Sequence, residues 1–252
     1  MARSFDDLVA EADAAPITGW DFSWLDGRAT EERPSWHYAE RVAERAAGAE
    51  RMLDLECGDG RLVAELPTLP HLVVGAEGYE PNARIAADRL GPRGGHVVRI
   101  GQDREVLPFA TATFDLVTSR HPITTWWSEI ARVLAPGGTY FSQQVGPGSV
   151  GELSDFMLGP QPGGSKRDPE LARAAAEATG LVVRDLRLER LRTEFDDIGA
   201  VVYFLRLVVW IVPGFSVDRF RDRLRALHDR IEREGPFVAH ATRFLIEATR
   251  PT

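Results

Sequence analysis

The chain has 252 residues, 44% of them hydrophobic, which suits one large globular domain. Its 30 basic and 38 acidic residues give a net charge of −8, so a nucleic acid is a disfavoured partner. The single cysteine excludes an internal disulfide, and no stretch reaches the roughly 18 uninterrupted apolar residues of a membrane span. We therefore expect a cytoplasmic protein with no membrane partner. We also expect it to be a monomer or a homodimer.

Residues 1–35 are expected to be largely irregular and to form a lid or a clamp. Trp20, Phe22 and Trp24 alternate in this segment, so they either pack against the core or contact a substrate. A helix is predicted to begin at Ser35, because serine is a favoured cap of helix N-termini.

Short apolar strands alternate with helices through residues 36–146, the predicted cofactor-binding core. The strands are expected at residues 51–55, 71–77, 96–100, 114–119 and 139–145, and the helices at residues 60–66, 81–90 and 124–134. This alternation is typical of βαβ units, which build a parallel sheet with helices on both faces.

Residues 147–252 are predicted to complete the same domain with helices on the substrate side. A Gly/Pro-rich loop is expected at residues 147–164, strands at 181–195 and 237–248, and helices at 170–180, 199–212 and 217–233. Residues 1–252 are therefore interpreted as a single domain of the α/β class.

The chemistry is expected around the stretch MLDLECGDG, residues 52–60. A buried strand followed by a glycine turn and a helix start presents backbone N–H groups to a ligand. Glu77 ends the next strand, where a carboxylate can accept both ribose hydroxyls, or can merely cap the following helix. Asp103 follows the third strand and could accept a hydrogen bond from an exocyclic amine. The third glycine of a dinucleotide fingerprint is absent, which favours a nucleoside without phosphates.

Four segments together resemble class I S-adenosylmethionine-dependent methyltransferases of the small-molecule, ubiquinone/menaquinone-biosynthesis type: LDLECGDG, VVGAEGYEPN, LPFATATFDLVTSRH and EIARVLAPGGTYF. The resemblance covers residues 35–146 closely. It implies a Rossmann-like, seven-stranded, mostly parallel sheet in the order 3-2-1-4-5-7-6, with an antiparallel final strand. It also implies S-adenosylmethionine as the cofactor and methyl transfer to an oxygen or nitrogen of a small-molecule acceptor.

The resemblance assigns residues to the cofactor. Gly58 and Gly60 would let the backbone approach its methionine part, and Asp54 would brace the turn and meet its ammonium group. Glu56 stands where the family has its first glycine, and its side chain either crowds the cofactor or places a carboxylate near the cofactor's positive charges. The full set of expected cofactor contacts is Asp54, Glu56, Cys57, Gly58, Gly60, Glu77, Gly78, Asp103, Arg104 and His121.

His121 is the candidate catalytic base, because it follows the fourth strand and its ordinary pKa suits proton transfer. The ring could instead shape the turn or line the cofactor pocket, and His37 and His240 are rivals. The candidate acceptor contacts are Trp36, Tyr38, Gln143, Gln144, Phe195 and Tyr203. No cluster has metal-ligand spacing, so no metal is expected. Two other functions stay open, an RNA-modifying methyltransferase and a non-catalytic cofactor-binding domain.

Overall fold

The computed structural model describes residues 3–17, 20–101, 106–161 and 166–252. Its residues cluster into two compact units, each described by itself below. Unit 1 comprises residues 1–33, 147–165 and 190–242, and unit 2 comprises residues 34–146, 166–189 and 243–252.

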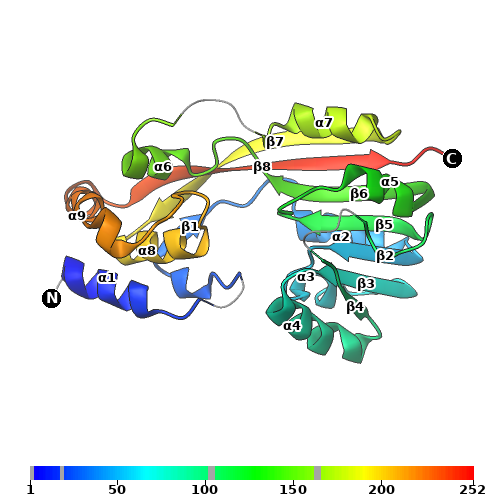
Figure 1. The fold of residues 1–252 in the computed structure, drawn as a ribbon, viewed down its shortest axis with the longest axis horizontal. Helices are drawn as coiled ribbons and strands as arrows, with labels where there is room; N and C mark the ends of the chain where they lie inside the picture. The colour runs from blue at the N-terminus through cyan, green and yellow to red at the C-terminus, as the bar shows by residue number, and fades with distance from the viewer. Residues whose placement is uncertain (1–2, 18–19, 102–105, 162–165) are drawn as a thin grey trace. The chain divides into compact units, whose positions relative to one another are not determined.

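Unit 2 is built on the parallel strands that the apolar runs predicted. These are β2 (Arg51–Leu55), β3 (Leu72–Glu77), β4 (His96–Arg99), β5 (Phe114–Arg120) and β6 (Leu134–Val145). β2 pairs in parallel with both β3 and β5, and β5 pairs in parallel with β6 (Figure 1). β8 (Phe237–Thr249) runs antiparallel to β6, which confirms the predicted antiparallel final strand.

Helices cover both faces of this sheet, as the alternation predicted. One face packs against α2 (Tyr38–Ala47), α3 (Arg61–Ala64) and α4 (Glu80–Leu90), with Met52, Leu116, Phe141 and Leu245 among the buried strand residues. The other packs against α5 (Trp127–Val133) and α7 (Pro169–Glu177), with Leu53, Val117, Tyr140 and Phe244 buried. Successive residues of each strand therefore point into different cores.

The helix after residue 35 begins later than predicted. Glu189 accepts hydrogen bonds from the backbone N–H of Ser35, at 2.9 Å, and from its hydroxyl. The serine is therefore not a helix cap, and α2 begins at Tyr38 after His37, whose backbone is left-handed.

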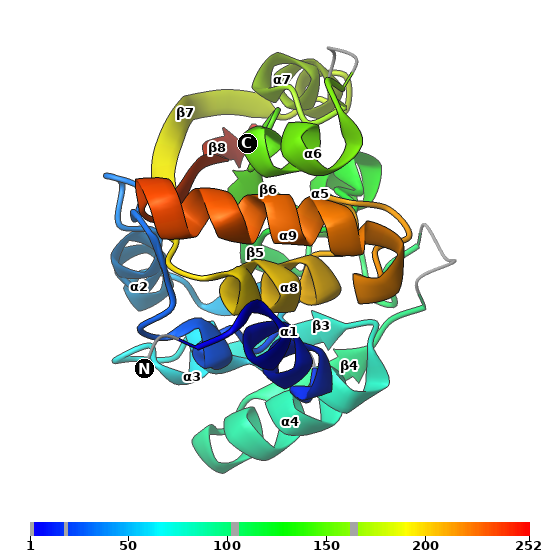
Figure 2. The ribbon, with the colours of Figure 1, turned by 90° about the vertical axis from the view of Figure 1, so that its left-hand side faces the viewer.

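Unit 1 contains elements that the sequence analysis placed in loops. α1 (Phe5–Ala14) and β1 (Ala29–Glu31) lie in the segment expected to be irregular, and α6 (Gly151–Leu158) lies in the expected Gly/Pro-rich loop. α8 (Ile198–Leu207) packs between α1 and α9 (Val217–Glu234), as Figure 2 shows. β7 (Val182–Phe195) pairs through Phe195 with Ala29 of β1 in an antiparallel register.

The predicted strand count and order need correction. Within the described residues the sheet has eight strands in the order β1-β7-β8-β6-β5-β2-β3-β4, instead of seven numbered 3-2-1-4-5-7-6. The extra strand is β1, which lies at the edge beside β7 and shifts the numbering of every later strand; the other seven keep the expected relative order. A three-residue strand is specified by its partner and has little local signal of its own.

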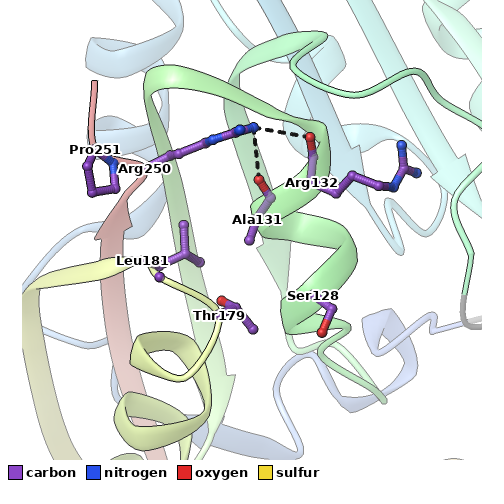
Figure 3. A pocket seen from close by; sticks show the side chains of 8 residues that line it. Ser128, Ala131, Arg132, Thr179, Leu181, Arg250 and Pro251 are labelled. Atoms are coloured by element: carbon purple, nitrogen blue, oxygen red, sulfur yellow. Dashed lines mark hydrogen bonds between the residues drawn. The ribbon is translucent and has the colours of Figure 1, made fainter.

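A shallow pocket of about 340 Å³ opens beside the C-terminal end of α5 in unit 2 (Figure 3). Ser128, Arg132, Thr179 and Arg250 are among its lining residues. The Arg250 guanidinium donates to the carbonyls of Ala131 at 3.2 Å and Arg132 at 3.3 Å, and also to that of Leu134. Carbonyls of the last helical turn have no partner within the helix, so Arg250 caps α5 with a positive charge.

Replacing Arg250 by Gln is expected to lower the free energy of unfolding by about 1–3 kcal/mol, because the charged bonds to the α5 carbonyls are lost. Urea unfolding monitored by circular dichroism measures the change. Arg184→Gln is the control, because exposed Arg184 makes a single bond to Thr249 and its loss should cost no more than about 0.5 kcal/mol. Equal losses in the two variants would contradict the capping role.

Candidate functional site

The glycine turn after β2 leaves space for a ligand. Glu56, Gly58 and Gly60 have left-handed backbones, with φ of +52°, +58° and +73°. A Cβ added at Gly60 would lie 3.1 Å from the Cβ of Ala86, so this position also requires glycine for packing. A Cβ added at Gly58 would meet no atom within 4 Å. Open space therefore adjoins the backbone at Gly58, where the sequence predicts the cofactor.

Glu77 joins the end of β3 to this turn. The residue is 7% exposed, and its carboxylate accepts hydrogen bonds from the backbone N–H groups of Gly58 and Tyr79, both at 2.8 Å. Tyr79 is the N-cap residue of α4, so the bond to its N–H group matches the capping alternative for Glu77. A carboxylate offers about four acceptor positions, which leaves room for hydroxyl donors as well.

Asp54 is a buried carboxyl group on the strand that precedes the turn. The hydroxyl of Thr118, opposite it on β5, donates to Asp54 Oδ1 at 2.6 Å. Burial raises the pKa of Asp54 to about 7, against the opposing effects of the Thr118 hydrogen bond and the charge of Arg120, and the charge of Glu77 raises it further. A cation bound nearby would therefore shift Asp54 to its charged form at neutral pH.

Glu56 links the turn to the loop that follows β5. Its carboxylate accepts hydrogen bonds from the backbone N–H groups of Ile123, at 2.6 Å, and Thr124, at 3.3 Å. A left-handed backbone costs a non-glycine residue about 1–2 kcal/mol, and these two bonds help to offset that cost. Burial raises the pKa of Glu56, and the charge of Glu77 contributes to the rise.

His121, Gln143 and Trp36 form a connected group at the carboxyl ends of β5 and β6. The His121 backbone N–H donates to the Gln143 carbonyl at 2.7 Å, and His121 Nε2 lies 2.9 Å from Gln143 Nε2. The Trp36 indole N–H donates to Gln143 Oε1 at 2.8 Å. Burial lowers the pKa of His121 well below its usual value, and the positive charges of Arg243 and Arg120 lower it further.

Comparisons with known proteins agree with this geometry. Residues 53–142 match the model of a methyltransferase domain. A 27-O-demethylrifamycin SV methyltransferase of Amycolatopsis mediterranei is 30% identical over 171 residues. That alignment covers 64% of this chain and 59% of the relative, so the chain matches less than two thirds of the relative's length.

Solved structures share the fold at low sequence identity. A Bacillus halodurans protein named as a candidate methyltransferase is 17% identical with a TM-score of 0.60, over 85% of this chain and 99% of its own. A Haemonchus contortus phosphoethanolamine N-methyltransferase, bound to phosphomonomethylethanolamine and S-adenosylhomocysteine, is 18% identical with a TM-score of 0.51. The match covers 86% of this chain and 53% of the Haemonchus chain. The domain match and the Amycolatopsis relative therefore show similarity to methyltransferases, and the solved structures show a shared fold.

The remaining cofactor candidates divide into three groups. The Cys57 side chain packs over Gly75, where an added Cβ would lie 2.8 Å from its sulfur, and the Cys57 backbone N–H and carbonyl bond Ala76 and Gly60. Burial raises the pKa of the Cys57 thiol, which keeps it protonated. Gly78 follows β3 and is partly buried. Asp103 and Arg104 lie outside the described residues.

Several predicted acceptor contacts are packed inside instead. Trp36 and Tyr38 are buried, and the Tyr38 hydroxyl donates to the carbonyls of Ser119, at 2.9 Å, and Phe141, at 3.2 Å. The Gln144 amide bonds the hydroxyls of Tyr140 and Thr125, each at 3.4 Å. These side chains belong to the core of unit 2, because their polar atoms already have internal partners.

The candidates from the C-terminal half, Phe195 and Tyr203, belong to the core of unit 1. Both are at most 2% exposed, and Tyr203 stacks on Trp24 with ring centroids 4.7 Å apart. Trp24 therefore packs against the core, one of the two expected roles, whereas Trp20 and Phe22 are more than 40% exposed. The rival His240 bonds Glu152 at 2.8 Å within unit 1.

Thr118 and Arg120 are site residues that the sequence analysis missed. Thr118 lies opposite Asp54 on β5 and donates a hydrogen bond to it. Arg120 is two residues further along the same face of β5, and its positive charge lowers the pKa of Asp54. Their alternation was visible, but their register against β2 was not. Across the described ranges there is no cluster of His, Cys, Asp and Glu that could hold a metal ion, and no helix long and apolar enough to cross a membrane.

The variant Asp54→Asn tests the buried carboxyl group and keeps an acceptor for Thr118. Because the folded-state pKa of about 7 exceeds the unfolded value near 3.8, the folded wild type binds the proton more tightly. The stability of the wild type relative to D54N should therefore fall between pH 5 and pH 7 and level off above pH 7. The total change should be about 2–3 kcal/mol, at 1.4 kcal/mol per pKa unit.

Urea unfolding of both proteins at pH 5, 6, 7 and 8 measures this difference. Asp59→Asn is the control: against the effect of burial, the hydrogen bonds and charges of Arg89 and Arg61 lower the pKa of Asp59, so its difference from wild type should stay constant from pH 5 to pH 8. Its stabilising effect is present at neutral pH and is lost only as the pH falls through the folded-state pKa. A pH-independent difference between wild type and D54N would show that Asp54 is not held near neutrality.

Proposed function

We propose that the chain transfers the methyl group of S-adenosylmethionine to an oxygen or nitrogen of a small-molecule acceptor. The observation that carries the proposal is the Glu77 carboxylate, which is hydrogen-bonded to the Gly58 N–H beside open space. S-adenosylmethionine, when bound, supplies an electrophilic methyl group on a positively charged sulfur. We further propose the ubiquinone/menaquinone-biosynthesis type, on the motif run that ends in RVLAPGG, and a cytoplasmic location.

Charge favours this cofactor over a dinucleotide. Asp54, Glu56 and Glu77 place three carboxyl groups around one turn, and the charge of Glu77 raises the pKa of the other two. A pyrophosphate would add negative charge to this environment, whereas ammonium and sulfonium groups would be attracted to it. Glu77 would hold the ribose hydroxyls, Asp54 the ammonium group, and the backbone at Gly58 and Gly60 the methionine part. Asp103 is proposed for the adenine amino group.

The chain's own task in such a reaction is alignment. Methyl transfer is an in-line displacement, so acceptor, methyl group and sulfur must be collinear, and positioning supplies much of the rate. The Glu56 carboxylate supports the loop after β5 by its two backbone bonds, and His121 stands at the start of that loop. We therefore favour accommodation of Glu56 within a working site over a non-catalytic domain.

A small molecule is the proposed acceptor, because the Amycolatopsis relative is named for one and the net charge of −8 disfavours nucleic acid. The test incubates the pure protein with methyl-labelled S-adenosylmethionine and a panel of hydroxyl and amine acceptors that includes 27-O-demethylrifamycin SV, and separately with ribosomal RNA. Label in a panel compound, with S-adenosylhomocysteine released, is the expected result. Binding without turnover would favour a non-catalytic domain, and labelled ribosomal RNA would favour the RNA alternative.

Replacing Glu77 by Ala should weaken S-adenosylmethionine binding by roughly 1–3 kcal/mol, because both the ribose acceptors and the brace on Gly58 are lost. Calorimetry measures the dissociation constant, with NAD as the competing cofactor. Glu80→Ala is the matched control, because its exposed carboxylate pairs with Arg99, at 3.0 Å, and with Arg84. An unchanged dissociation constant in the Glu77 variant would remove this assignment.

A further inference from the structure

Trp36, Gln143 and His121 form a hydrogen-bonded chain within unit 2 whose directions can be assigned. The Trp36 indole nitrogen lies 2.8 Å from Gln143 Oε1, and Gln143 Nε2 lies 2.9 Å from His121 Nε2. Trp36 and Gln143 are each 3% exposed, so water cannot readily replace these partners. Their directions are therefore set by the chemistry of the three side chains.

An indole nitrogen can only donate, which begins the assignment at Trp36. The Gln143 group that faces it must accept, so the Gln143 carbonyl oxygen points to Trp36 and the amide nitrogen points to His121. An amide nitrogen only donates, so His121 Nε2 must accept through its lone pair. In a neutral imidazole the other nitrogen then carries the hydrogen, so His121 is the Nδ1–H tautomer.

The surroundings keep this ring neutral. Burial and the charges of Arg243 and Arg120 disfavour imidazolium. The backbone fixes the ring's position, because the His121 N–H donates to the Gln143 carbonyl at 2.7 Å and His121 has a left-handed φ of +55°. Nδ1 has no hydrogen bond to any described residue, so its N–H group remains available for a ligand.

We propose that His121 donates a hydrogen bond from Nδ1 to an oxygen atom of a bound ligand, and that Gln143 and Trp36 are positioning residues that fix this tautomer. In this arrangement neither ring nitrogen has a free lone pair, so His121 is not the general base expected from the sequence. The assignment of the tautomer stands on the contacts alone. The assignment of a ligand oxygen as the hydrogen-bond acceptor rests on the proposed function, and that oxygen belongs either to the cofactor or to the acceptor substrate.

The tautomer is read directly by long-range proton–nitrogen NMR of the ligand-free, nitrogen-15-labelled protein, with His121→Asn identifying the His121 signals. The expected pattern is a protonated Nδ1 and an unprotonated Nε2 from pH 6 to pH 8. A protonated Nε2, or titration near the ordinary histidine pKa, would overturn the proposal. This readout needs no methyl transfer, so it fails or succeeds independently of the proposed function.

Gln143→Glu tests the positioning role, because a carboxylate can accept from both the Trp36 and the His121 rings. The Nε2 hydrogen should then appear and the pKa of His121 should rise. Gln144→Glu is the matched control on the other face of β6, and should leave the His121 signals in the wild-type pattern. Trp36→Phe frees the Gln143 amide to turn and should give a mixture of His121 tautomers. This second variant tests the positioning role if Gln143→Glu does not fold.

The ligand oxygen is located with a matched pair of variants. The variant His121→Asn keeps an N–H donor near the place of Nδ1 and tolerates the left-handed backbone, whereas His121→Gln places its amide nearer to Nε2. Loss of the hydrogen bond should cost about tenfold. A tenfold weaker S-adenosylmethionine dissociation constant in H121Q, but not in H121N, assigns the oxygen to the cofactor. The same pattern confined to the acceptor's kcat/KM assigns it to the acceptor, and no difference between the variants in either would refute the donor role.

Discussion

The close approach of the glycine turn to β3 is the constraint on which the site depends. Asp54 of β2 lies opposite Gly75 of β3 in a parallel register, and the Cys57 sulfur occupies the space that a side chain at position 75 would need. Because Gly75 has no side chain, the turn packs directly on β3, and the Gly58 nitrogen lies 2.8 Å from the Glu77 carboxylate. A larger residue at position 75 would push the turn away, and both the brace on Gly58 and the ligand space beside it would change.

The same approach concentrates negative charge. Asp54, Glu56 and Glu77 reach the turn from two adjacent strand ends, and each has hydrogen-bond donors that reduce the cost of burial, from Thr118, the β5–α5 loop, and the backbone at Gly58 and Tyr79. These donors leave the three groups sensitive to one another, since Glu77 raises the pKa of both neighbours. A bound cation relieves that repulsion, so the electrostatics favour a positively charged ligand by the same contacts that shape the turn.

Most local elements were predicted from the sequence and the relative order of seven strands from the family resemblance, but the residue register between strands was not, for a physical reason. β2 was predicted at its observed bounds, because an apolar run between turn residues is a local signal. α6 was missed because glycine and proline surround it, although Leu153 and Met157 bury one side of a helix. The bond between Asp54 and Thr118 depends on strand register, which many distant contacts decide together and no single segment encodes.

Site residues show the same division. Motif spacing predicted Glu77 and His121 at strand ends and Gly58 in the turn, and the structure has them there, while their cofactor and acceptor roles stay predictions. Their hydrogen-bond partners were not predicted: Trp36 was proposed as an acceptor contact, and in the structure it bonds Gln143. Positions along the chain were therefore predictable, whereas the role proposed for His121 depends on which atom a neighbour presents to it.

A neutral donor and a general base make different demands on the acceptor. A base removes the acceptor's proton at the site, so a weakly acidic hydroxyl can react. A donor at Nδ1 instead stabilises negative charge that is already present on an oxygen, and Arg120 and Arg243, whose charges act on His121, favour the same state. If that oxygen belongs to the acceptor, its proton must leave to solvent on binding. The suitable acceptors are then acidic hydroxyls such as phenols and enols, because their anions form at neutral pH at the smallest cost.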